Sequence, residues 1–66
     1  MKIIVNGESR TLPDGSSVAD LVASLDLGGA PCAVEVNRTV VPKADHPTTA
    51  IGEGDTIEVV TLVGGG

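Results

Sequence analysis

The sequence predicts an α+β domain in which a mixed sheet of four to five strands packs around one helix. Two observations lead to this prediction. Segments that alternate apolar and polar residues occur near both ends of the chain and in its middle, as expected for strands with one buried face. Between the first of these segments and the rest, one stretch carries apolar residues at helical spacing. With 66 residues the chain forms one domain with a small core.

The chain opens with a predicted β-hairpin. Residues 2–6 are rich in β-branched side chains, with Ile4 on the opposite face from its two neighbours. Asn6-Gly7 favours a tight type I′ turn, because both residues tolerate a positive φ. Residues 8–12 then form the return strand, whose polar composition suits a solvated face.

The helix has a clear beginning and end in the sequence. Ser17 is a good N-cap, and Asp20 follows at the position of the acidic partner in a capping box. Gly28-Gly29 ends the helix after about ten residues, a length that needs tertiary packing for stability. The apolar stripe that faces the sheet consists of Val18, Leu21, Val22 and Leu25.

Three further strands are predicted. Residues 32–37 place Cys32, Val34 and Val36 inward, and residues 39–41 form a short edge strand before Pro42. In the final strand, residues 56–63, Ile57 and Val59 point inward while Glu58, Val60 and Leu62 point outward. The first and last strands are the most apolar, so we expect them to pair centrally and in parallel. This arrangement is a ubiquitin-like β-grasp.

The last residues, Gly64-Gly65-Gly66, follow directly on this strand. Three glycines have no side chain to bury and the most backbone entropy to lose, so we expect a β-grasp domain over residues 1–63 and a flexible tail over residues 64–66. From Val63 onward the extended tail reaches roughly 14 Å. Such a thread fits a channel too narrow for other backbones and presents a terminal carboxylate to a partner enzyme. The alternative interpretation is a frayed chain end.

Composition excludes several classes of function. There are no aromatic residues to stack on bases, and nine acidic against four basic side chains give a net charge of −5, so nucleic-acid binding is not expected. A partner with a basic face is expected instead. The small core leaves little room for an enclosed catalytic cleft, so the chain is not expected to be an enzyme. One cysteine, no leader and no apolar run of ~20 residues predict a cytoplasmic protein without a membrane segment.

Isolated reactive residues do not indicate a catalytic or metal site. Cys32 has no general base near it in sequence and is interpreted as a small buried apolar residue rather than a nucleophile. His46, in an irregular loop over residues 43–50, is predicted to be a surface residue, and no metal site is expected. Gly52-Glu53-Gly54-Asp55 lacks the helix and lysine of a phosphate cradle and predicts a tight turn.

Over nearly its whole length the chain resembles the ThiS family, the sulfur carriers of thiamine biosynthesis. The resemblance depends on the order and spacing of several short motifs. They are Asn6-Gly7, Leu12-Pro13-Asp14-Gly15, Val18-Ala19-Asp20-Leu21-Val22, Ala33-Val34-Glu35-Val36-Asn37, Val41-Pro42, Gly54-Asp55 and Gly64-Gly65-Gly66. The third terminal glycine exceeds the minimum pattern of two, and the absence of aromatic residues is unusual.

The resemblance implies a carrier that binds no cofactor itself. An E1-like adenylyltransferase of the ThiF type uses ATP and magnesium to adenylate the carboxylate of Gly66, with Gly64 and Gly65 threaded into its active site. A persulfide sulfur donor then supplies the sulfur of a thiocarboxylate. A thiazole synthase of the ThiG type takes that sulfur for the thiazole ring.

The residues predicted to dock on the activating enzyme lie on the open side of the sheet. They are Ile4, Val60, Leu62 and Val63, with Glu58 at the rim. Two alternatives of other kinds stay open at this point. One is a related carrier for molybdopterin or cysteine synthesis, or a ubiquitin-like protein modifier. The other is a non-covalent β-grasp binding module whose C-terminus has no chemical role.

Overall fold

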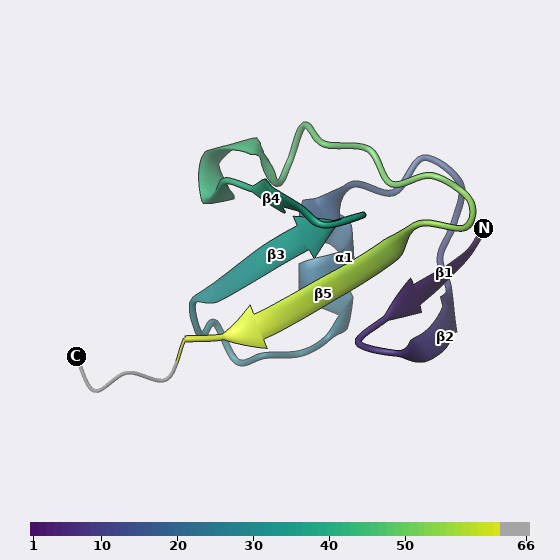
Figure 1. The fold of residues 1–66 in the computed structure, drawn as a ribbon. Helices are drawn as coiled ribbons and strands as arrows, with labels where there is room; N and C mark the ends of the chain where they lie inside the picture. The colour runs from purple at the N-terminus through teal and green to yellow at the C-terminus, as the bar shows by residue number, and fades with distance from the viewer. Residues whose placement is uncertain (63–66) are drawn as a thin grey trace.

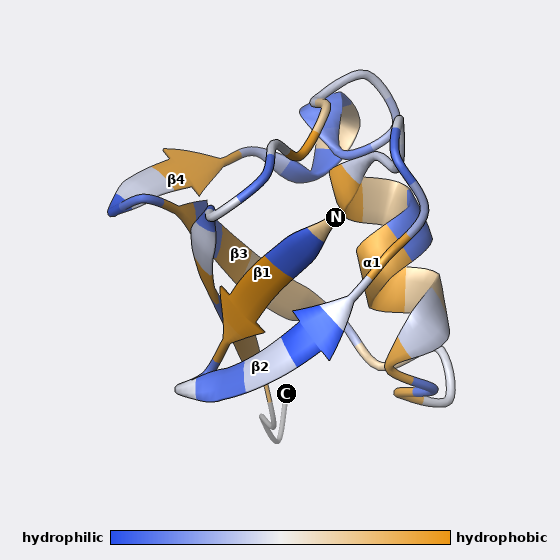
Figure 2. Ribbon diagram, turned by 90° about the vertical axis from the view of Figure 1, so that its right-hand side faces the viewer, coloured by the Kyte–Doolittle hydropathy of each residue, from blue (hydrophilic) through white to orange (hydrophobic). Residues whose placement is uncertain are grey.

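The computed structural model describes residues 1–62, which form a five-stranded sheet with one α-helix and a short 3-10 helix (Figure 1). The helix α1 lies across one face of the sheet, and the other face is open (Figure 2). The predicted α+β fold class is confirmed. The elements are β1 (Lys2–Val5), β2 (Glu8–Thr11), α1 (Val18–Ser24), β3 (Cys32–Val36), β4 (Thr39–Val41), the 3-10 helix η1 (Lys43–Asp45) and β5 (Thr56–Thr61).

The strand order in the sheet is β2-β1-β5-β3-β4. As predicted, β1 and β5 are parallel and central, while the other neighbours pair antiparallel. Asn6 and Gly7 have φ of +50° and +82°, the left-handed values that a tight hairpin turn requires. Asn37 and Arg38 repeat this conformation between β3 and β4, with φ of +50° and +70°.

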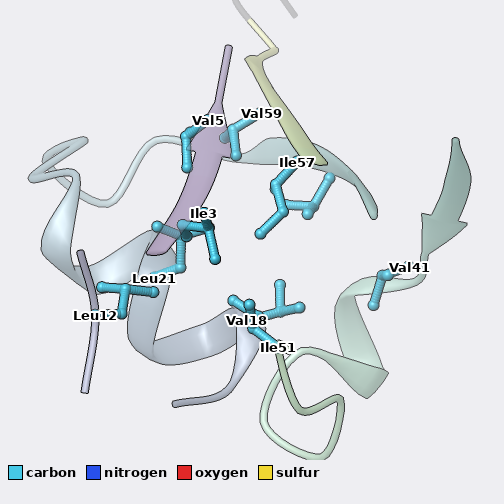
Figure 3. Packing of buried hydrophobic residues seen from close by; sticks show 10 residues of the cluster. Ile3, Val5, Leu12, Val18, Leu21, Val41, Ile51, Ile57 and Val59 are labelled. Carbon is cyan, nitrogen blue, oxygen red and sulfur yellow. The ribbon is translucent and has the colours of Figure 1, made fainter. Parts of the chain in front are cut away.

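An all-aliphatic core fills the space between the sheet and α1 (Figure 3). Its fully buried members come from β1, α1, β3 and β5, so every central element contributes. Because protein interiors are close-packed, small branched side chains fill this thin layer without any aromatic residue. The buried set is Ile3, Val5, Leu12, Val18, Leu21, Val34, Val41, Ile51, Ile57 and Val59.

The N-terminus of α1 has the predicted capping box. The Asp20 N–H donates to Ser17 Oγ at 3.1 Å, and the Ser17 N–H donates to Asp20 Oδ2 at 2.9 Å. Two other N–H groups of the first turn donate to the carbonyl oxygens of His46 and Thr49. The groups that a helix start leaves without intrahelical partners are therefore satisfied.

We predict that Ser17→Ala lowers the free energy of unfolding by ~1 kcal/mol, because the amide of Asp20 loses its acceptor. Urea denaturation followed by far-ultraviolet circular dichroism measures the change. Ser17→Asn keeps a capping oxygen and should stay near the parent. An unchanged midpoint for Ser17→Ala would show that the cap does not stabilise the fold.

The helix and most strands end earlier than predicted, and one short element was not predicted. The helix has 7 residues rather than about ten, because Leu25 is already its C-cap and Asp26 adopts a φ of +55° before the glycines are reached. The strand β5 ends at Thr61 rather than Val63, and η1 interrupts the loop that was predicted to be irregular. Within residues 1–62, no helix is long and apolar enough to cross a membrane.

Candidate docking face

The open face of the sheet carries the large exposed apolar side chains found within residues 1–62. In Figure 1 this face is turned toward the viewer, with α1 behind the sheet. The exposed fractions are 37% for Ile4, 65% for Val40, 59% for Val60 and 55% for Leu62. A surface of this composition on a small domain is typical of a protein interaction site.

The alternation in β5 is as predicted. Ile57 and Val59 are buried against α1, while Glu58 and Val60 are exposed on the open face. A register shifted by one residue would have exchanged these two sets. Leu62 lies just beyond the strand, and its N–H still donates to the Pro31 carbonyl at 2.9 Å. The pairing with β3 therefore holds the chain up to the last described residue.

The structure divides the predicted docking residues into two groups. Val60 is opposite Ala33 of β3, and Leu62 follows it two positions later along the same face. Ile4 is the partner of Thr56 on the other side of β5. Val60 lies four positions beyond Thr56, which places Ile4 about 13 Å along the sheet from Val60. Ile4 is thus at the margin of the face.

Two apolar members of this face were not predicted. Ala33 lies opposite Val60, and Val40 of the edge strand lies opposite Glu35. The short turn at Asn37-Arg38 was the available signal, because a tight turn fixes which residues of two strands face each other. Counting back from that turn puts Val40 on the same face as Glu35.

Asn6 ties the hairpin turn to β5 through its side chain. Its Nδ2 donates to the Val59 carbonyl at 3.0 Å, and its Oδ1 accepts from the Val59 N–H at 2.9 Å. The side chain thus continues the ladder between β1 and β5 beyond the end of β1. Because Val59 directly precedes Val60, this pair of bonds fixes the strand that carries the docking face.

A hollow of about 480 Å³ lies on the helix side of the sheet, between the end of α1, the segment 26–32 and η1. Cys32 and His46 both line it, but no hydrogen bond joins them within the described residues. Cys32 is half-buried and packs against the core, in line with its interpretation as an apolar residue. This hollow holds no recognisable pair of nucleophile and base.

The prediction of a surface location for His46 is wrong. The side chain is only 8% exposed, and its Nε2 is 3.1 Å from the carbonyl oxygen of Val41. Its own backbone carbonyl accepts from the first turn of α1, so the residue links η1 to the helix. Within residues 1–62, no cluster of three potential metal ligands occurs.

The turn at Gly52–Asp55 is confirmed. The Asp55 carboxylate accepts from the Gly52 N–H at 2.8 Å and from Asn37 Nδ2 at 3.0 Å, and Gly54 has a φ of +81°. The carboxylate closes the loop on itself, because it accepts from the amide three residues earlier in the chain. The remaining predicted site residues, Val63, Gly64, Gly65 and Gly66, lie outside the described residues.

Comparison with known proteins identifies the family. The model of the ThiS family matches residues 3–66. The chain belongs to the ThiS family. The predicted membership in the ThiS-type carriers is thereby confirmed. The crystal structure of the thiamine biosynthesis protein ThiS from Geobacter metallireducens superimposes with a TM-score of 0.83 at 29% identity, over 100% of both chains.

Among curated relatives of this ThiS family member, the sulfur carrier protein ThiS of Escherichia coli is 27% identical over 100% of both chains. Thiazole synthase of Paramagnetospirillum magneticum is 36% identical over the whole chain, which spans only 20% of that protein. Thiazole synthase of Magnetococcus marinus shows the same 36% identity and the same 20% share. The chain therefore spans about a fifth of the length of these two relatives.

Proposed function

We propose that this protein is a sulfur carrier for thiazole formation in thiamine biosynthesis, with the carboxylate of Gly66 as the group that carries sulfur. The observation that supports this most is the family match, which extends to Gly66 itself. The alignment with Escherichia coli ThiS likewise covers all of both chains. In this proposal the β-grasp domain holds β5, the strand that precedes the tail. The catalytic groups belong to partner enzymes in the cytoplasm.

A carboxylate resists attack by a nucleophile, because the attack adds charge to a group that is already anionic. Adenylation removes this obstacle: a carboxylate oxygen of Gly66 attacks the α-phosphorus of ATP and pyrophosphate leaves. ATP and Mg²⁺ are bound by the activating enzyme, an E1-like adenylyltransferase of the ThiF type. The terminal sulfur of a persulfide donor then attacks the acyl carbon and AMP leaves. A thiol that takes the inner persulfide sulfur releases the thiocarboxylate.

The geometry of the described residues supports a defined way of presenting Gly66. The outward side chains of β5 form a docking surface directly before the tail, and Asn6 and Pro31 fix this strand from both sides. We propose that Val60, Leu62 and Val63 contact the activating enzyme, with Glu58 beside them and Ile4 at the margin. Gly64 and Gly65 pass through the channel of the enzyme. Because glycine has no Cβ atom, this channel can be narrower than one that admits other residues.

The acceptor of the sulfur is proposed to be a thiazole synthase of the ThiG type. Two relatives that carry this name contain a segment similar to the whole chain within a longer protein. Placing a carrier and its acceptor on one polypeptide raises their effective concentration relative to each other. This association supports thiazole synthase over the acceptors of molybdopterin or cysteine synthesis.

The test is intact-mass analysis of the chain after incubation with ATP, magnesium, a ThiF-type activating enzyme and a persulfide donor. We expect the mass to increase by the difference between sulfur and oxygen, and the increase to require ATP. Addition of thiazole synthase with its other substrates should return the original mass. A chain that is never modified under conditions that load Escherichia coli ThiS would contradict the proposal.

Val60→Asp tests the docking surface. We expect the rate of adenylation at low carrier concentration to fall at least tenfold, because a charge buried against an apolar surface loses its hydration without gaining a partner. Val60 is 59% exposed in the free protein, so its far-ultraviolet circular dichroism spectrum should stay native. Ala23→Asp, at an exposed position of α1 on the other side of the sheet, adds the same charge away from this face and serves as the control. Equal rates for Val60→Asp and the parent would exclude β5 from the interface.

A further inference from the structure

We propose that Glu35 and Glu58 together bind one arginine side chain of the activating enzyme at the centre of the docking face. This inference rests on the proposed function, and it names a chemical group that the partner must supply. Glu35 of β3 and Glu58 of β5 are direct partners in the antiparallel ladder. Both side chains therefore project from the same face of the sheet.

The register of the ladder brings the two carboxylates close together. Hydrogen bonds at Asn37–Thr56 (2.7 Å, N to O) and at Leu62–Pro31 (2.9 Å) mark the hydrogen-bonded positions at the two ends. These positions alternate along an antiparallel pair, so Glu35 and Glu58 also form a hydrogen-bonded pair, with Cα atoms about 5.5 Å apart. Two like charges directly opposite each other destabilise a sheet. The free protein therefore gains no stability from this pair.

No lysine or arginine within residues 1–62 forms an ion pair with Glu35 or Glu58. Within residues 1–62, the only ion pair joins the N-terminal ammonium group to Asp14 at 3.2 Å. Arg10 is the partner of Ile3, whose side chain is buried under α1, so Arg10 projects from the other face. Lys2 is on the open face. Because Ile4 pairs with Thr56 in parallel register, Lys2 is level with residue 54, four positions before Glu58. Lys2 is therefore about 13 Å from Glu58 along the strand direction.

Apolar side chains border the two carboxylates toward the C-terminal end of β5 and toward the edge strand β4. The next ladder pair on this face is Ala33 with Val60, and Val40 stands beside Glu35 on the edge strand. A partner that covers Val60 and Val40 must also cover the carboxylates between them. Covering two charges without a counter-charge carries a large desolvation penalty, so the partner has to supply a cation at this point.

An arginine fits these two carboxylates better than a lysine. Its planar guanidinium has several N–H donors in a fixed fork and can donate to two carboxylates at once. It is also less strongly hydrated than an ammonium group, which suits a site that loses water on binding. The net charge of −5 on this chain adds long-range attraction toward a basic surface.

The experiment measures ATP–pyrophosphate exchange by a ThiF-type enzyme as a function of carrier concentration. The variants are Glu35→Gln, Glu58→Gln and the double variant. Glu8→Gln is the matched control, because it removes the same charge from the other face of the sheet. The Glu8 side chain projects from that face because its ladder partner, Val5, is buried under α1. We expect the double variant to raise the KM for the carrier at least tenfold with kcat unchanged, and the control to leave both unchanged.

Two further readouts separate this role from a merely structural one. Raising the salt concentration should increase the KM of the parent more steeply than that of the double variant, because the double variant lacks the close attraction to the arginine and keeps only the weaker attraction of its remaining net charge. The urea midpoint of the free double variant should equal or exceed that of the parent, since a like-charge pair is removed. A lowered midpoint, or a KM equal to that of the parent, would overturn the inference. Failure of the parent itself to support exchange would overturn the proposed function and this inference with it.

Discussion

Deleting Gly66 is expected to lower the rate of adenylation at least tenfold, a loss of ~1.4 kcal/mol in the transition state. The activating enzyme must place the terminal carboxylate in line with the α-phosphate of ATP, and reaction rates respond to misplacement well below 1 Å. Removing one residue withdraws the carboxylate by up to ~3.5 Å. Contacts of the enzyme with Val60 and Leu62 would fix the start of the tail, so the thread cannot slide forward to compensate.

Extension of the chain past Gly66 by one alanine gives the matched comparison. It displaces the carboxylate in the opposite direction and adds a methyl group to a channel that accepts glycine, so we expect a larger loss than for the deletion. ATP–pyrophosphate exchange measures both. Equal rates for the parent, the deletion and the extension would contradict a carrier whose carboxylate reacts. If only the deletion retains the parent rate, Gly65 is the working terminus and the third glycine is dispensable.

Asn6→Ala is expected to cost the fold about 2–3 kcal/mol. The substitution removes both hydrogen bonds from the Asn6 side chain to Val59, each with a net contribution of roughly 1 kcal/mol. It also forces alanine into a left-handed conformation at φ +50°, at a cost of about 1 kcal/mol. The loss is large for so small a domain. Urea denaturation followed by circular dichroism measures it, since the chain contains no tryptophan or tyrosine for fluorescence.

Asn6→Gly separates the two contributions. Glycine accepts the positive φ without strain but lacks the amide, so this variant should lose only the part that comes from the hydrogen bonds, about 1–2 kcal/mol. Asn6→Gly should therefore stay folded and measurable even if Asn6→Ala is unfolded. An Asn6→Gly variant as stable as the parent would show that the bonds to Val59 contribute nothing.

The sequence predicted correctly those features that depend on neighbouring residues: which face a strand residue occupies, the hairpin turn and the helix cap. The alternation in residues 56–60 gives the correct faces because burial of Ile57 and Val59 is strongly favoured over the shifted register. The turn at Asn6-Gly7 and the cap at Ser17 depend on neighbouring residues alone and were also predicted correctly.

Features that depend on contacts distant in sequence were not predictable in this way. Asn6 was interpreted only as a turn residue, because its bonds to Val59 span 53 positions of the chain. The burial of His46 depends on how the loop packs against α1, and nothing in its immediate neighbours indicates that contact. That Ala33 lies opposite Val60 depends on the pairing of β3 with β5, whereas Val40 could have been placed from the turn at Asn37-Arg38 alone.

The central position of β5 has a mechanical consequence. An enzyme that draws the C-terminal residues into its channel pulls along the axis of this strand, whose neighbours β1 and β3 hold it on both sides (Figure 1). The hydrogen bonds to these neighbours lie across the direction of pull, as do the two from Asn6 to Val59. Such bonds are loaded together in shear, whereas a strand peeled from an edge breaks them one at a time. The domain can therefore bear tension on its C-terminal end while the strand that carries Val60 stays in register.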